Sequence, residues 1–191
     1  MELKKKIILA SQSPRRKELL RQIGINDFKI LKHSVDENSY QLSNPISKSI
    51  MNLAEMKAKS IKKSLIKTHI VISADTIVMR AGKVFPKPYS KEIVKSYLKT
   101  LSNKKHHVYG GICVLYNNIV FRRFIKTEVY FHKISELDLS DEILDDGIGK
   151  AGGYAIQNHG AKFVRKIRGC HTNIVGISIP ELYKILKSLE F

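Results

Sequence analysis

The sequence predicts an α/β fold in which a mixed, twisted sheet is flanked by helices. Three observations favour it: short apolar runs typical of buried strands near the N-terminus, amphipathic helical patterns towards both ends, and long strand-like stretches in the middle. The chain has 191 residues, of which 43% are hydrophobic, and this is enough for a substantial core. We expect residues 1–191 to form a single domain, built as one body or as two intimate lobes.

The first predicted feature is a strand, a tight turn and a helix. Residues 5–10 form a short apolar run that is typical of a buried strand. Ser13 then lies where an N-cap is expected, and Pro14 lies at the first helical position. Gly24 closes the helical pattern.

Two adjacent arginines, Arg15 and Arg16, fall in the first turn of this helix. Cations there oppose the helix dipole unless an anion lies nearby. Two interpretations remain open. The segment is an ordinary capped helix with solvated arginines, or it is a phosphate site in which helix N–H groups and the hydroxyls of Ser11 and Ser13 join the guanidinium groups.

A second strand and a long helix follow. Residues 28–37 (FKILKHSVDE) predict a strand that ends in Asp36 and Glu37. Asn44 and Pro45 then open a helix with an apolar face: Ile46, Ile50, Leu53, Ala54, Ala58, Ile61 and Leu65. Lys57 falls inside this stripe. Its ammonium either snorkels to the edge of the core, which is the commoner arrangement, or has a function.

Asp75 interrupts the apolar run His69–Met79, which otherwise predicts a fully buried strand. Burying an ionised carboxylate without a partner is unfavourable by several kcal/mol. We therefore expect Asp75 at the end of the strand, facing a cleft, a cation or both.

Lys87 lies between Pro86 and Pro88, so stiff backbone presents its side chain. The other elements predicted in the second half are a turn at 81–82, a helix from Ser90 to Leu101, strands at 106–116, 119–132 and 161–167, a hairpin turn at Asn117 and Asn118, a short helical turn at 140–144, a glycine-rich approach to a strand at 149–157, and a C-terminal helix at 180–189.

Composition indicates an anionic partner. Lys and Arg number 34 against 17 Asp and Glu, giving a formal net charge of +17. Aromatic residues do not interleave with the lysines along the chain, as a stacking platform for bases would require. The charge therefore indicates an anionic ligand and leaves open whether it is a nucleic acid or a nucleotide. The apolar runs are shorter than the roughly 18 residues that cross a bilayer, and the isolated Cys113 and Cys170 favour a reducing compartment. We expect a cytoplasmic protein without a membrane anchor.

A series of motifs resembles the Maf-like nucleoside triphosphate pyrophosphatases, also called septum formation inhibitor proteins. In chain order they are LASQSPRRKELL (9–20), VDE (35–37), LAEMKA (53–58), SADTIV (73–78), KP (87–88), KAGGYAIQ (150–157), FVRKIRG (163–169) and NIVGI (173–177). Each motif is weak alone, but their order over nearly the whole chain is specific.

This resemblance implies a hydrolase that cleaves nucleoside triphosphates between the α and β phosphates and releases pyrophosphate, with a divalent metal (Mg²⁺, Mn²⁺ or Co²⁺). It also implies a fold similar to inosine triphosphate pyrophosphatase, with a cleft between two lobes, and a homodimer. In the family, the position of Asp75 is the proton acceptor, and those of Arg15, Thr76 and Gln157 are associated with substrate choice. Gln157 resembles the branch acting on dTTP and UTP, whose biological sense is sanitation of the nucleotide pool.

The chemistry of the residues agrees with these implied roles. Cations suit the triphosphate and the charge that develops on the leaving pyrophosphate. On this interpretation the triphosphate is held by Ser11, Ser13, Arg15 and Arg16, and the developing charge is neutralised by Lys57 and Lys87. Gln157 offers both a donor and an acceptor, which suits the Watson–Crick edge of a pyrimidine.

Glu37 and Asp75 are the carboxylates available to hold Mg²⁺, which takes few protein oxygens and keeps several waters. Asp75 would also orient or deprotonate the attacking water. Because nearby cations make a carboxylate a weak base, we expect its metal-holding role to matter at least as much as proton abstraction.

The chain departs from the family pattern in a few places. The segment between Asp141 and Lys150 is shorter, and the single-residue departures are Pro86, Asn103, Gly110 and Ser178. Two alternatives to a dTTP and UTP pyrophosphatase remain. One is a 7-methyl-GTP pyrophosphatase, and the other is a non-enzymatic nucleic-acid-binding protein or cell-division regulator.

Overall fold

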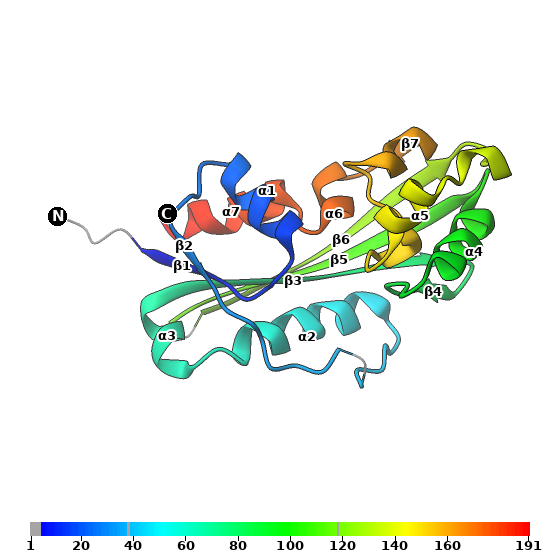
Figure 1. The fold of residues 1–191 in the computed structure, drawn as a ribbon. Coiled ribbons are helices and arrows are strands. Elements are labelled where there is room, and N and C mark those ends of the chain that lie inside the picture. Colours follow the sequence, from blue (N-terminus) through cyan, green and yellow to red (C-terminus); the bar gives the residue numbers. More distant parts are fainter. Residues whose placement is uncertain (1–4, 38, 118) are drawn as a thin grey trace. The chain divides into compact units, whose positions relative to one another are not determined.

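The computed structural model describes residues 5–37, 39–117 and 119–191, and it confirms the mixed α/β fold (Figure 1). The strands are β1 (Lys6–Leu9), β2 (Phe28–Ile30), β3 (His69–Arg80), β4 (Lys83–Phe85), β5 (Lys105–Tyr116), β6 (Ile119–Phe131) and β7 (Val164–Arg168). They form one seven-stranded sheet in the order β2-β1-β3-β5-β6-β7, with β4 paired to β3.

Helices flank these strands. The α-helices are α1 (Pro14–Gln22), α2 (Ile46–Lys59), α3 (Lys63–Thr68), α4 (Lys91–Leu101), α5 (Asp141–Gly147), α6 (His171–Val175) and α7 (Ile179–Ser188). Three short 3₁₀ helices are η1 (Glu136–Asp138), η2 (Ala151–Gly153) and η3 (His159–Phe163). Within the described ranges, none of the helices is both long and apolar enough to cross a membrane.

The chain divides into two compact units. Unit 1 comprises Met1–Asp75, Gly110–Ile125 and Gly176–Phe191, and unit 2 comprises Thr76–Tyr109 and Lys126–Val175. The long strands β3, β5 and β6 therefore contribute residues to both. That residues 1–191 act as a single domain stays a prediction, as does a cleft between lobes.

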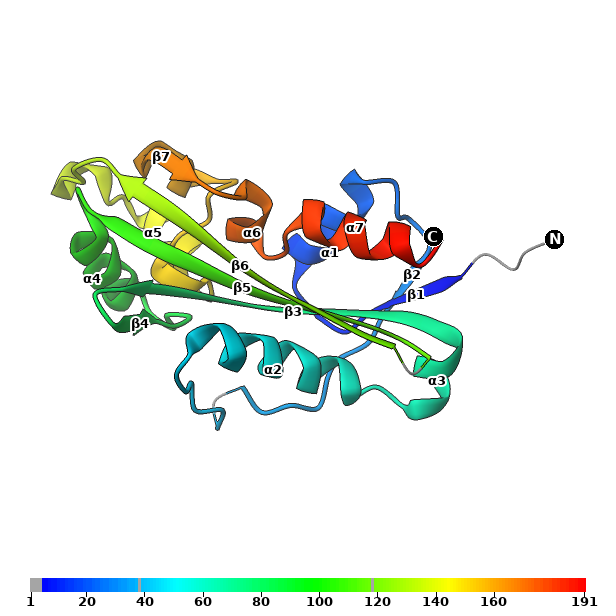
Figure 2. The same ribbon diagram turned by 180° about the vertical axis from the view of Figure 1, so that it is seen from behind.

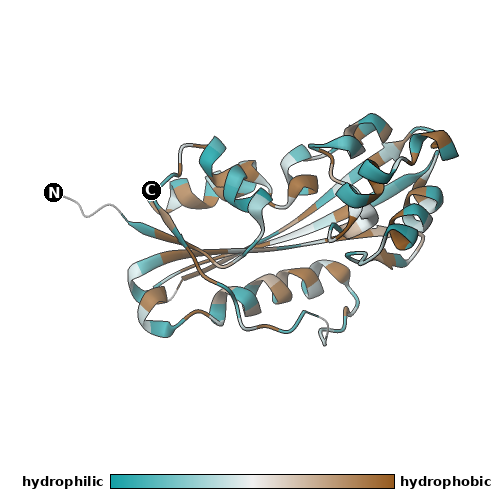
Figure 3. Ribbon diagram, viewed as in Figure 1, coloured by the Kyte–Doolittle hydropathy of each residue, from teal (hydrophilic) through white to brown (hydrophobic). Residues whose placement is uncertain are grey.

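In unit 1 the sheet is buried on both faces. Strand β1 runs parallel to β2 and to β3, with Ile7 opposite Phe28 and Ile70. Successive side chains of a strand point to opposite faces, and both Ile7 and Ile8 are buried. Figure 1 shows the cover: α2 lies on one side of these strands, and α1 and α7 lie on the other. The helices alternate hydrophobic and hydrophilic stretches along their length (Figure 3), as amphipathic helices do.

Helix α2 approaches strand β5 closely at Gly111. A Cβ at this position would lie 2.5 Å from the Ile50 carbonyl oxygen and 2.8 Å from its carbonyl carbon. The absence of a side chain therefore allows helix backbone and strand backbone to meet. One apolar cluster fills this side of unit 1: Ile8, Ala10, Ala54, Ala58, Ile61, Val71, Cys113 and Leu115.

In unit 2 a buried aromatic group forms part of the core around His106. Its Nε2 lies 2.8 Å from the Tyr154 hydroxyl, and the imidazole meets the Phe131 ring edge-on. Burial, followed by the charges of His107 and Arg80, lowers the pKa of His106 to about 3. The neutral ring is thus an ordinary core residue. The unit ends at an edge where β7 pairs antiparallel with β6 (Figure 2).

Several predicted boundaries are wrong. The strand predicted over 28–37 ends at Ile30, because residues 31–37 leave the sheet. The long helix stops at Lys59, where the Ser60 hydroxyl donates to the Lys57 carbonyl oxygen at 2.8 Å and satisfies one free group of the last turn. The glycine-rich segment leads into η2 and η3 instead of directly into a strand, so the strand predicted from Ala161 begins at Val164. Asn118 of the predicted hairpin turn lies outside the described residues.

We predict that Gly111→Ala destabilises the protein by about 1–3 kcal/mol, because the new methyl group would force α2 away from β5. Urea unfolding, followed by circular dichroism, measures the change in the midpoint at constant slope. An unchanged midpoint would contradict the close approach of the two backbones.

Candidate functional site

Three charged side chains, Glu37, Lys57 and Asp75, lie in contact in unit 1. Lys57 lies on the last turn of α2 and is only 1% exposed. Its Nζ donates to Asp75 Oδ1 at 2.5 Å and lies 2.8 Å from Glu37 Oε1. The snorkelling interpretation of Lys57 is therefore wrong, since its ammonium ends between two carboxylates and away from solvent.

A nearby hydrogen bond between α2 and β3 positions Lys57 opposite Asp75. The Ser73 hydroxyl donates to the Ala54 carbonyl oxygen at 2.5 Å. Lys57 lies three residues beyond Ala54, about 4.5 Å along the helix, and Asp75 lies two residues beyond Ser73, about 6.7 Å along the strand. Because Ser73 and Asp75 share a face of the strand, the contact brings the ammonium and the carboxylate opposite each other.

The expectation that Asp75 lies at the end of its strand is wrong. Strand β3 continues to Arg80, and Asp75 lies in its interior with 6% of its surface exposed. The expectation that it faces a cation is confirmed by Lys57. A carboxylate can remain inside a strand here because an ion pair compensates for its lost hydration.

A second basic group comes from the N-terminal turn of α1. The Arg16 Nε–H donates to the Gly176 carbonyl oxygen at 2.9 Å, and its Nη1 donates to Ser11 Oγ at 3.1 Å. Burial lowers the pKa of Arg16, while the charges of Asp75 and Glu37 raise it. The guanidinium therefore feels the same two carboxylates as Lys57.

Ser11 organises the turn before α1. It is buried, and its Oγ also accepts the Ser13 backbone N–H at 3.2 Å. Ser13 occupies the N-cap position as predicted, but its side chain makes no cap hydrogen bond. Arg15 is half-buried in the first turn of α1. The structure thus brings Ser11 and Arg16 together, with Ser13 and Arg15 on the same short turn.

Two neighbours of the site were missed by sequence reasoning. His33 Nε2 lies 3.2 Å from Glu37 Oε1, and burial together with the nearby Lys57 charge lowers the pKa of His33. The four-residue spacing of His33 and Glu37 was visible, but the expected strand would have separated them. The Gly176 carbonyl is a backbone group, so no residue type in the sequence could have indicated its role.

The carboxylates Glu37 and Asp75 fit a hard divalent cation. Both approach one nitrogen, so their oxygens converge, and Mg²⁺ needs only one or two protein carboxylates beside water and phosphate oxygens. Across the described ranges, no group of three or more His, Cys, Asp or Glu side chains could hold a metal by itself. The donor set therefore suits an ion that is shared with a ligand better than an ion enclosed by protein.

The Maf-like protein family matches residues 6–189 of this sequence. The chain belongs to the Maf-like family. Two relatives of similar length carry the name dTTP/UTP pyrophosphatase. The protein of Clostridium perfringens (strain SM101 / Type A) is 38% identical over 188 residues, and that of Clostridium botulinum (strain Okra / Type B1) is 37% identical over 190, with 97% of each chain covered.

Among solved structures, the Ham1 protein of Staphylococcus aureus aligns with 96% of this Maf-like chain and 99% of its own, at 15% identity and a TM-score of 0.46. A score at this level does not establish a shared fold. Membership of the Maf-like family is confirmed by the sequence relatives. The expected likeness to inosine triphosphate pyrophosphatase stays a prediction.

Three predicted site residues of this Maf-like chain belong to unit 2. Thr76 follows Asp75 directly on β3, so its side chain points to the opposite face of the strand. Lys87 is exposed on the segment after β4, and Gln157 is exposed on the turn between η2 and η3. Their roles stay predictions.

Local contacts within unit 2 hold the segment 141–150, whose shortening relative to the family stays a prediction. It forms α5, which is longer than the predicted turn, and the Gly149 N–H donates to the Pro88 carbonyl oxygen at 2.8 Å. Lys150 Nζ donates to the Asp146 carbonyl oxygen. The segment therefore contacts the backbone of Pro88, next to Lys87.

We predict that Lys57→Met lowers the free energy of unfolding by about 3–5 kcal/mol, because it leaves two carboxylates facing each other without their common cation. Lys59→Met is the matched control. It lies on the same helical turn with a 59% exposed side chain, so its effect should stay within about 1 kcal/mol. Equal urea midpoints for the two variants would show that the buried ammonium does not hold the carboxylates together.

Proposed function

We propose that this chain is a nucleoside triphosphate pyrophosphatase that hydrolyses dTTP and UTP to the monophosphate and pyrophosphate. The observation that carries the proposal is the 38% identity, over 97% of both chains, to a protein named dTTP/UTP pyrophosphatase. The charges of unit 1 support it, since the buried Lys57 and the half-buried Arg16 lie near two carboxylates there. The wider role would be removal of unsuitable nucleotides, including modified pyrimidine nucleotides, from the cytoplasmic pool.

In this proposal the basic residues bind the triphosphate. The guanidinium groups of Arg15 and Arg16 would bind phosphate oxygens, with Ser11 and Ser13 completing the turn. Lys57 and Lys87 would neutralise the charge that develops on the leaving pyrophosphate. Because Lys57 is already held by two carboxylates, its ammonium needs little reordering to act.

Glu37 and Asp75 would hold a divalent cation, Mg²⁺, Mn²⁺ or Co²⁺. Such an ion supplies positive charge next to the phosphates of the substrate. Asp75 would in addition orient the attacking water and accept its proton.

Thr76 and Gln157 would contribute to substrate choice, as the family resemblance implies. The side-chain amide of Gln157 can donate to a pyrimidine carbonyl and accept from a ring N–H. A 7-methyl-GTP pyrophosphatase is the nearest alternative, and it is less supported because both relatives compared above carry the pyrimidine name. We also propose that the enzyme works as a homodimer.

The nucleic-acid-binding alternative has one supporting surface in unit 2. Contrary to the impression from the linear sequence, two cations lie near Tyr130: Lys105 Nζ is 6.0 Å from its ring centre and the Arg168 guanidinium is 5.8 Å from it. However, Glu128 accepts hydrogen bonds from the Tyr130 hydroxyl and from Lys105, which lower its pKa to about 2. An ionised carboxylate beside Tyr130 would repel phosphates, which weakens the nucleic-acid-binding alternative.

We predict that Asp75→Asn reduces pyrophosphate release by about a hundredfold or more, because it removes both a metal-holding oxygen and the proton acceptor. The fold should remain, since Lys57 keeps Glu37 as a partner. The measurement is pyrophosphate release with Mg²⁺ or Mn²⁺ across dTTP, UTP, CTP, GTP and 7-methyl-GTP.

Asp27→Asn, which removes an exposed carboxylate in unit 1, is the control and should retain activity. Near-normal turnover by Asp75→Asn would refute the role of Asp75. If the folded unsubstituted protein released no pyrophosphate from any nucleotide, the binding or regulatory alternative would take precedence.

For Gln157→Glu we predict a change in nucleotide preference. The carboxylate cannot donate to a pyrimidine carbonyl, so kcat/KM for dTTP and UTP should fall about tenfold or more relative to the other nucleotides. The metal requirement should be unchanged. An equal loss for all substrates would indicate a structural role for this exposed turn residue.

A further inference from the structure

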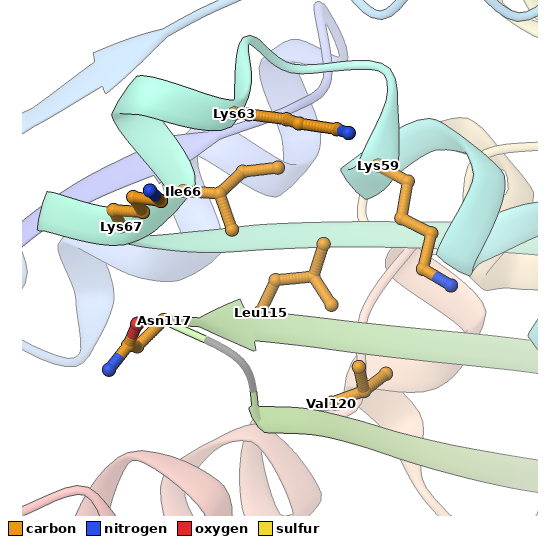
Figure 4. Close-up of a pocket in the computed structure, with 7 residues that line it drawn as sticks. All are labelled: Lys59, Lys63, Ile66, Lys67, Leu115, Asn117 and Val120. Atoms are coloured by element: carbon orange, nitrogen blue, oxygen red, sulfur yellow. The ribbon is translucent and has the colours of Figure 1, made fainter.

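A pocket of about 440 Å³ lies in unit 1, and no step of the proposed hydrolysis uses it. It is formed where the end of α2, helix α3, the end of β5 and the start of β6 come together (Figure 4). The residues that line it are Lys59, Lys63, Ile66, Lys67, Leu115, Asn117 and Val120. They combine two kinds of surface, an apolar floor and a basic rim.

Three aliphatic side chains make the floor. Leu115 is buried in the apolar cluster of unit 1, Ile66 packs against that cluster, and Val120 is 39% exposed. Figure 4 shows Ile66 and Leu115 facing each other from α3 and β5, with Val120 below them. Covering these side chains with another apolar group would remove apolar surface from water, which is favourable.

A backbone hydrogen bond joins two of the elements that form the pocket, α3 and β5. The Asn117 N–H donates to the Ile66 carbonyl oxygen at 3.0 Å, so the end of β5 is tied to α3. The pocket is therefore largely preformed, as small-molecule sites usually are, and its volume falls within their usual range of about 300–1,000 Å³.

Lysines make the rim. Lys63 and Lys67 lie one helical turn apart on α3, and like charges at this spacing disfavour each other by a few tenths of a kcal/mol. Neither makes an ion pair with any residue that the structure describes. Lys59 pairs with Glu55 at 2.5 Å, and that carboxylate is also bound by Arg122 at 2.9 Å. Positive charge on this rim thus exceeds the negative charge that faces it.

We propose that this pocket binds an amphipathic anion, a small molecule with an apolar body and a carboxylate or phosphate end. The apolar body would cover Ile66, Leu115 and Val120. The anionic end would accept charge-assisted hydrogen bonds from Lys63 and Lys67 and relieve their mutual repulsion. A purely polar anion would leave the floor exposed, and a purely apolar molecule would leave the lysines unpaired.

The pocket is distinct from the charged cluster around Lys57. Lys57 and Lys59 are two residues apart on α2, which turns them about 200° from one another around the helix axis. Lys57 is buried against β3, whereas Lys59 is exposed at the pocket. One helix therefore separates the two sites, and occupancy of the pocket does not require the nucleotide.

The test uses the full chain and the fluorescent probe 8-anilinonaphthalene-1-sulfonate, which has an aromatic body and one anionic group. We expect saturable binding of one equivalent. Octanoate and octyl phosphate should displace the probe, and octylammonium should not. The more effective of the two anions would distinguish a carboxylate ligand from a phosphate ligand.

Two double variants with the same change in net charge complete the experiment. Lys63→Gln with Lys67→Gln should weaken probe binding about tenfold or more. Lys48→Gln with Lys62→Gln removes two exposed lysines that do not line the pocket and should leave binding unchanged. Pyrophosphate release should be unchanged in both. Absence of saturation, equal loss in both variants, or displacement by octylammonium would overturn the proposal.

Discussion

The buried ammonium of Lys57 is compensated by two carboxylates that reach it from different parts of the chain. Glu37 comes from the irregular segment after β2, and Asp75 comes from the interior of β3. An uncompensated charge at this depth would cost several kcal/mol. The position of α2 on the sheet, the path of residues 31–37 and the charge within β3 therefore depend on one another. As a result, the two carboxylates are assembled before any ligand arrives.

The same reasoning accounts for the arginines at the start of α1. Cations in a first helical turn are unfavourable alone, but Arg16 donates to the Gly176 carbonyl and to Ser11 Oγ and lies in the field of Asp75 and Glu37. Local contacts thus offset the opposing dipole. Unit 1 thus pairs its cations with carboxylates, which lets the ammonium of Lys57 be buried beside an apolar core while Arg16 remains half-buried.

The strand–turn–helix at the N-terminus was predictable because its sequence carries the usual signals for a helix start. The charged site residues were predictable because each interrupts an apolar pattern. Asp75 interrupts an apolar run, and Lys57 interrupts an apolar helical face. The partner of each could not be read from such patterns, since pairing Lys57 with Glu37 requires knowing that residues 31–37 leave the sheet. The carbonyl of Gly176 was also out of reach, because every residue has one. The break between α2 and α3 depends on the Ser60 hydroxyl, and the hydrophobic period continues through it.

Unit 1 is assembled from three stretches of chain that are far apart in sequence. The last of them, Gly176–Phe191, supplies both the carbonyl that holds Arg16 and the amphipathic helix α7. Contacts between residues far apart in a chain form slowly, because the intervening loop must close first. During synthesis on the ribosome, the turn that carries Arg16 must wait for Gly176 to emerge before this contact can form.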